Sequence, residues 1–83
     1  MAEKPSANEL GTVLTAAGSA HHEYETESLG GARDEQWAAF YAAFVLGRLG
    51  DFALPSALTR WLEEAPAGED WSKSTAEHVL KQL

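Results

Sequence analysis

The sequence predicts an all-α protein, either a compact four-helix bundle or an orthogonal helical array. Apolar residues recur every three or four positions along most of the chain, which is the period of one helix face. No stretch shows the strict alternation of apolar and polar residues that is typical of a half-buried strand. Glycine and proline residues separate the helical segments. We expect residues 1–5 to form a disordered N-terminal tail and residues 6–83 to form a single helical domain.

The first expected helix begins after Ser6 and ends near Leu29. Ser6 and Glu9 have the spacing of a capping box, in which each side chain accepts a hydrogen bond from the other residue's backbone. Gly30 and Gly31 can adopt the left-handed conformation that ends a helix. Between these signals one stripe of residues lies on a single helix face: Leu10, Val13, Leu14, Ala17, His21 and Tyr24.

The second expected helix has Asp34 as its N-cap and ends at Gly50-Asp51. Its apolar residues are so dense that we expect it to be the central and most buried helix. The residues that carry this expectation are Trp37, Phe40, Tyr41, Phe44, Val45, Leu46 and Leu49, flanked by alanines.

Two shorter helices are expected in the last third of the chain. Pro55 suits a first helical turn, so we expect a helix over residues 55–65. Pro66-Ala-Gly68 then interrupts the chain. Ser72 is the expected N-cap of the last helix, whose inner face carries Ala76, Val79, Leu80 and Leu83.

Composition excludes several classes of function. The chain carries 13 acidic and 6 basic residues, a net charge of −7 that repels phosphate backbones, so we expect no nucleic-acid partner. There is no cysteine, which excludes disulfides, thiolate zinc sites and thiol nucleophiles. The first eight residues contain no hydrophobic run, so we expect no signal peptide, no membrane association and a cytoplasmic location.

Polar side chains cluster at the end of the first expected helix. His21 and Glu25 lie one helical turn apart with Tyr24 beside them, whereas His22 points outward. An imidazole next to a carboxylate can act as a general base, and a phenol can donate to an oxyanion, so His21, Tyr24 and Glu25 are candidate catalytic residues. The candidate ligand- or partner-binding residues are His21, His22, Tyr24, Glu25, Asp34, Trp37 and Tyr41.

Two other interpretations of this cluster remain open. His21 and Glu25 could supply two metal ligands from one helix face. A second pair of ligands would be needed, for which Asp34, Glu35 and His78 are the obvious candidates. They do not form a recognisable second pair, so the sequence predicts no metal site and no cofactor. Alternatively, the cluster simply satisfies hydrogen bonds between two helices and fixes how they cross.

A longer pattern runs through the same region. The segments Ala20-His21-His22-Glu23-Tyr24-Glu25, Leu29-Gly30-Gly31, Asp34, Trp37 and Phe40-Tyr41-Ala42-Ala43-Phe44 follow one another at short intervals. This order resembles that of a group of small uncharacterised bacterial helical proteins, with A-H-x-x-Y-E, a glycine turn, D-x-x-W and W-Y-A-x-Y. In this chain Ala38 stands where a proline follows the tryptophan, and Phe40 stands where a second tryptophan occurs. The resemblance implies a helical fold and a polar site, and no particular reaction.

The sequence leaves two functions open. The first is a small acidic interaction or regulatory module that binds another protein or a second copy of itself. The alternative is a small-molecule-binding protein or compact enzyme that uses a cleft formed by His21, Tyr24, Glu25 and Asp34. No complete catalytic constellation is present in the sequence, so it leaves enzymatic activity open and favours a non-enzymatic role.

Overall fold

The computed structural model describes residues 3–65 and 70–83, and these residues form four α-helices and no strand. The helices are α1 (Ala7–Glu27), α2 (Trp37–Leu49), α3 (Pro55–Glu64) and α4 (Trp71–Gln82). The predicted all-α fold class is confirmed. Of the expected disordered tail, residues 1 and 2 lie outside the described part, residues 3–5 have no regular secondary structure, and Pro5 is buried. The expected break at residues 66–68 also lies outside it.

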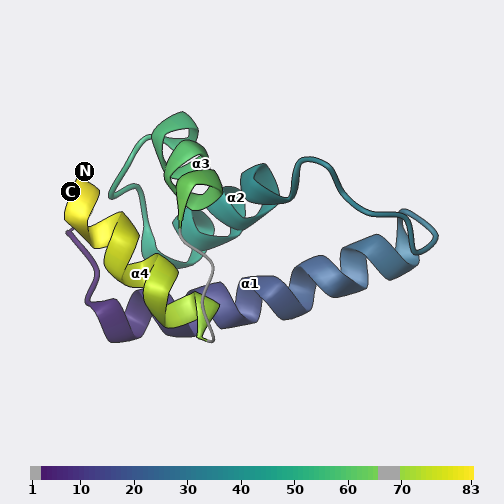
Figure 1. Cartoon of the computed structure of the whole chain (residues 1–83), viewed down its shortest axis with the longest axis horizontal. Helices are drawn as coiled ribbons and strands as arrows, with labels where there is room; N and C mark the ends of the chain where they lie inside the picture. The colour runs from purple at the N-terminus through teal and green to yellow at the C-terminus, as the bar shows by residue number, and fades with distance from the viewer. Residues whose placement is uncertain (1–2, 66–69) are drawn as a thin grey trace.

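α1 is the longest helix and runs along one side of the molecule (Figure 1). α2 and α4 both pack on α1, and α3 packs on α2 and α4, so each helix contacts two others. The core lies between all four helices, and the connection between α2 and α3 adds Phe52 to it. The largest apolar side chains that are completely buried are Leu10, Leu14, Val45, Leu58, Leu62 and Val79. Among the described residues, no helix has both the length and the apolar character that crossing a membrane requires.

The ends of α1 follow the sequence signals. The hydroxyl of Ser6 accepts from the backbone N–H of Glu9 at 3.1 Å, and the Glu9 carboxylate accepts from the N–H of Ser6 at 3.1 Å, so the capping box is confirmed. Gly30 and Gly31 have φ values of 62° and 88°, which confirms the left-handed turn after the helix. The N–H of Gly31 donates to the carbonyl of Glu25 at 2.8 Å and turns the chain back toward α1.

Two of the expected N-caps are wrong. α2 begins at Trp37 with Gln36 as its N-cap, two residues after the beginning that Asp34 would define. The Asp34 carboxylate instead accepts from the N–H of Gln36, two residues on, which forms a turn before the helix. α4 begins at Trp71 because Asp70, whose side chain accepts from Lys73 N–H at 3.2 Å, is the N-cap. Ser72 therefore lies inside the first turn of α4.

The expectation that α2 is the most buried helix is confirmed, because a larger share of its residues is buried than in any other described helix, although one side of it is partly exposed. Its inner side is covered by α1 and α3, and Ala38, Ala42, Val45 and Leu46 are buried there. The opposite side consists of Ala39, Phe40, Ala43, Phe44 and Gly47, which we call the outer face of α2. On this face Ala39, Ala43 and Gly47 are exposed and the two phenylalanines are half-buried. Of the described helices, α1 reaches the N-terminal end of this face, where the rings of His21 and Tyr24 pack on Phe40.

Candidate functional site

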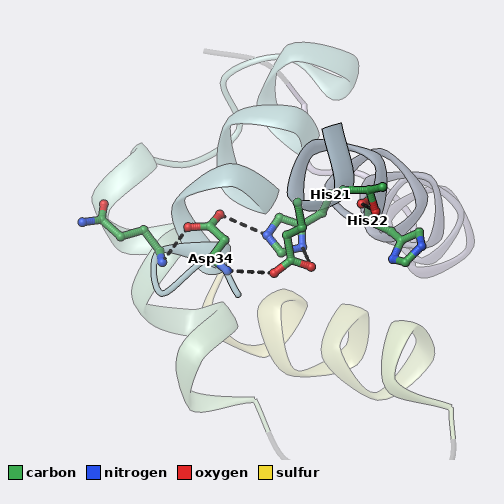
Figure 2. Close-up of polar contacts among 6 residues, drawn as sticks. His21, His22 and Asp34 are labelled. Atoms are coloured by element: carbon green, nitrogen blue, oxygen red, sulfur yellow. Dashed lines mark hydrogen bonds and ion pairs between the residues drawn. The ribbon is translucent and has the colours of Figure 1, made fainter. Parts of the chain in front are cut away.

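The polar cluster expected from the sequence exists at the connection between α1 and α2. His21 extends from the last third of α1 toward Asp34, which lies in the segment that leads into α2 (Figure 2). Nε2 of His21 lies 3.0 Å from Oδ2 of Asp34, within hydrogen-bonding distance. Nδ1 of His21 lies 3.8 Å from Oε1 of Glu25, one turn further along α1. The imidazole therefore lies between two carboxylates.

The same two carboxylates also bind the backbone of the connection. Oε2 of Glu25 accepts from the N–H of Asp34 at 2.8 Å. Oδ1 of Asp34 accepts from the N–H of Gln36 at 2.9 Å. Three of the four carboxylate oxygens thus lie within hydrogen-bonding distance of a backbone N–H or of the His21 ring, and the fourth, Oε1 of Glu25, lies 3.8 Å from the ring. The cluster fixes the path of the chain between the two helices, because it ties the backbone N–H and the carboxylate of Asp34 to α1.

Aromatic rings enclose the imidazole. His21 is only 7% exposed. The ring of Phe40 meets it edge-on with 5.0 Å between centroids, and the ring of Tyr41 lies 5.3 Å away. Tyr24 lies at the rim of the cluster, 38% exposed, and stacks on Phe40 at 5.3 Å. Low exposure strengthens the electrostatic contact between His21 and its carboxylates, because little water screens it.

Tyr41 connects the cluster to α4. Its ring contacts those of Trp37 and Trp71 edge-on, each at 5.5 Å. Burial, and secondarily the negative charge of Glu25, raises the pKa of the Tyr41 hydroxyl above its ordinary value of 10.0. The phenol is therefore neutral at physiological pH and can act only as a hydrogen-bond donor or acceptor there.

A small hollow opens beside these groups. Its volume is about 220 Å³, and its lining combines the polar cluster with Arg33 and two aromatic residues. Drug-sized ligands occupy pockets of roughly 300–1,000 Å³, so this hollow has room only for a smaller molecule. Both nitrogens of His21 face carboxylates of the chain. To act as a general base on a molecule in the hollow, the imidazole would first have to leave one of these partners.

Most, but not all, of the residues singled out in the sequence come together here. His21, Glu25, Asp34, Trp37 and Tyr41 line one hollow. His22 does not join them: it is exposed, and Figure 2 shows its ring pointing away from His21 and Asp34. His22 lines a different depression, between α1 and the beginning of α4. The outward direction expected for His22 from helix periodicity agrees with this position.

Three residues that form part of the site were not predicted from the sequence. Phe40, assigned only to the core, packs on both His21 and Tyr24. Arg33 lines the hollow, and its position directly before Asp34 was the available signal. Gln36 binds Asp34 through its backbone N–H, for which a side-chain pattern gives no signal.

The cluster is not arranged as a metal centre. Within residues 3–65 and 70–83, no group of three or more His, Cys, Asp or Glu side chains could hold a metal ion. In the pair His21 and Glu25, the ring nitrogen and the carboxylate oxygen face each other at 3.8 Å.

Comparison with protein-family models, curated proteins and solved structures finds no match to this chain. The resemblance to small bacterial helical proteins therefore stays a prediction, and the function has to be argued from the chain's own residues.

Proposed function

We propose that this chain is a small interaction module that acts by binding another protein through the outer face of α2. A single observation carries the proposal: α2 is apolar on nearly all sides, yet Ala39, Ala43 and Gly47 on its outer face are exposed. Arg48 is the only charged residue among the 13 of this helix. A helix that is apolar all round is normally buried all round in a folded protein. An uncovered apolar face of this kind is typical of a protein-binding site.

The aromatic content of the face supports the same proposal. Phe40 and Phe44 lie one turn apart on it, and Tyr24 of α1 extends it by stacking on Phe40. Aromatic residues are enriched at protein interfaces because they bury a large area and have few rotatable bonds. Ala43, between them, and Gly47, after Phe44, leave room for the close approach of another backbone.

The polar cluster fits this proposal as a positioning element. His21, Glu25 and Asp34 hold the connection next to the outer face of α2, and their polar atoms are already paired. A rigid binding surface loses less conformational entropy on association than a mobile one. The alternative, a small-molecule site at this cluster, has weaker support because the hollow is small and its carboxylates are engaged within the chain.

Site-specific photo-crosslinking in cells that naturally make the protein tests the proposal. A photoreactive amino acid at Ala43, which is exposed on the outer face, is expected to form a defined covalent adduct with a protein. The matched control is the same residue at Ser56, which is exposed on α3. The proposal is wrong if position 43 gives no adduct, or the same adducts as position 56.

A further inference from the structure

We propose that the partner bound by the outer face of α2 is a second copy of this chain, packed with its α2 antiparallel about a twofold axis. This inference rests on the proposed function and names the partner. A twofold interface pairs one patch with itself, so the patch must be complementary to its own rotated copy. The outer face of α2 meets this condition in shape and in charge.

The register follows from the order of large and small residues. The twofold axis crosses α2 level with the midpoint between residues 41 and 42. Phe40 then faces Ala43 of the second copy, and Phe44 faces its Ala39. Each large side chain then lies over a small one. At a rise of about 1.5 Å per residue, both pairs lie within about 4 Å of the axis along the helix. Alternating large and small side chains allow two helices to approach to the usual 8–10 Å.

The same register brings opposite charges together at the ends of the interface. Arg48, at the end of α2, faces Glu35 of the second copy, just before the beginning of its α2. Both residues are exposed, so they are accessible to a partner. The twofold axis produces this pair twice. Complementary charges at the edge of an apolar interface fix its register and orientation.

A hollow in the surface can receive the second copy. It has a volume of about 590 Å³ and lies at the N-terminal end of the outer face, between the α1–α2 connection and α2 itself. Its apolar lining includes Tyr24, Leu29, Ala39 and Phe40, and its charged lining consists of Arg33, Asp34 and Glu35. The lining therefore combines apolar residues with two acidic residues and one basic residue.

The group that enters this hollow in the proposed dimer has the matching chemistry. It is the pair of Phe44 and Arg48 of the second copy, in which the guanidinium already lies 4.7 Å from the centre of the Phe44 ring. The ring would contact Tyr24 and Ala39, while the guanidinium reaches Glu35. Asp34 is already paired with His21, so Glu35 is the carboxylate that remains for Arg48. The stacked pair is preformed, which lowers the entropy lost on binding.

Sedimentation equilibrium over about 5–500 µM protein tests the inference, because this range detects dimers whose Kd is micromolar or lower. We expect the wild-type chain to associate to twice its mass of 9.0 kDa. Ala43→Glu, on an exposed position, is expected to raise Kd at least tenfold without unfolding the monomer, which circular dichroism checks. Ser56→Glu, exposed on α3, is the matched control and is expected to leave Kd unchanged.

A charge exchange tests the antiparallel register. Arg48→Glu places a like charge opposite Glu35, and we expect it to raise Kd about tenfold. The double variant Glu35→Arg/Arg48→Glu restores opposite charges, and we expect its Kd to return to within about threefold of wild type. If Ala43→Glu dissociates the dimer but the exchange does not restore affinity, the antiparallel register is wrong.

Failure of this inference is distinguishable from failure of the proposed function. A wild-type chain that stays monomeric over the whole range overturns the inference, as does a dimer that Ala43→Glu leaves intact. The proposed function survives in either case if a photoreactive residue at position 43 captures a different protein that position 56 does not. If position 43 captures nothing, both proposals are wrong.

Discussion

The substitution Asp34→Asn measures how much the contact between His21 and Asp34 contributes to the free energy of unfolding. Asp34→Asn keeps the shape of the side chain and the oxygen that accepts from Gln36, but removes the charge that faces the imidazole. The two side chains are only 9% and 14% exposed, so solvent screens their 3.0 Å contact weakly. A hydrogen bond to a charged group contributes about 1.5–3 kcal/mol, and we expect Asp34→Asn to cost about 2 kcal/mol. In a domain of this size that corresponds to a fall in Tm of roughly 8–16 °C.

A double-mutant cycle with His21→Leu isolates the contact itself. Urea unfolding, followed by far-ultraviolet circular dichroism and by tryptophan fluorescence, gives the free energy of unfolding of each variant. We expect a coupling energy of about 1–2 kcal/mol between His21 and Asp34. Glu23→Gln, on an exposed position of α1, is the matched control and is expected to change stability by less than about 0.5 kcal/mol. A coupling energy below about 0.3 kcal/mol would refute the view that this contact fixes the connection.

The remaining predictions concern two glycines and one tyrosine. Gly47→Ala adds a methyl group where no atom lies within 4 Å, so dilute protein should gain about 1 kcal/mol of helix stability. Gly18→Ala should gain less, because its new methyl group would lie 3.3 Å from the hydroxyl of Tyr41; urea unfolding compares the two variants. Folding raises the pKa of Tyr41 above 10.0, so the Tyr41 hydroxyl ionises at a lower pH in the unfolded chain than in the folded one. The contribution of Tyr41 to stability is therefore complete below about pH 10 and falls as the pH rises further. Tyr41→Phe should make this alkaline loss smaller, and unfolding midpoints at about pH 9 and about pH 11 measure it; equal losses in both proteins would contradict the assignment.

Much of the fold and part of the site could be predicted from local pattern. The capping box at Ser6 and the glycines after α1 depend on neighbouring residues alone, and both have the expected geometry. Helix periodicity also placed His21 toward the core and His22 toward solvent, as found. These features depend on contacts within about one helical turn, so the sequence contains all the information that determines them.

The errors arose where a side chain has a choice of partners. Asp34 has the residue type of an N-cap, but its carboxylate binds His21 and the N–H of Gln36, so the chain makes a turn first and α2 begins later. At the beginning of α4, Asp70 and Ser72 are both suitable caps, and Asp70 makes the bond. A pattern identifies residues that are able to cap, but tertiary and local partners decide which one does.

The side of α2 that faces the core could not be predicted from its sequence, for a different reason. Because nearly every residue of this helix is apolar, its pattern does not define which side faces the core. That choice depends on where α1 and α3 pack, and they leave Ala39, Ala43 and Gly47 exposed. The same property underlies the proposed binding surface, because residues suited to the core remain exposed on the outer face, where a partner could cover them.

The polar cluster and the outer face of α2 are physically connected through the segment between α1 and α2. Glu25 and His21 hold this segment through Asp34, and the next residue, Glu35, lies at the edge of the hollow beside the outer face. Loss of the His21–Asp34 contact would therefore free Glu35 as well as weaken the fold. Since the carboxylates of Glu25 and Asp34 are engaged inside the chain while Glu35 is exposed, Glu35 offers negative charge to a partner at one end of the outer face, and Arg48 offers positive charge at the other. This distribution favours recognition of a protein surface with one cationic group next to an aromatic ring, which is what the other end of α2 presents.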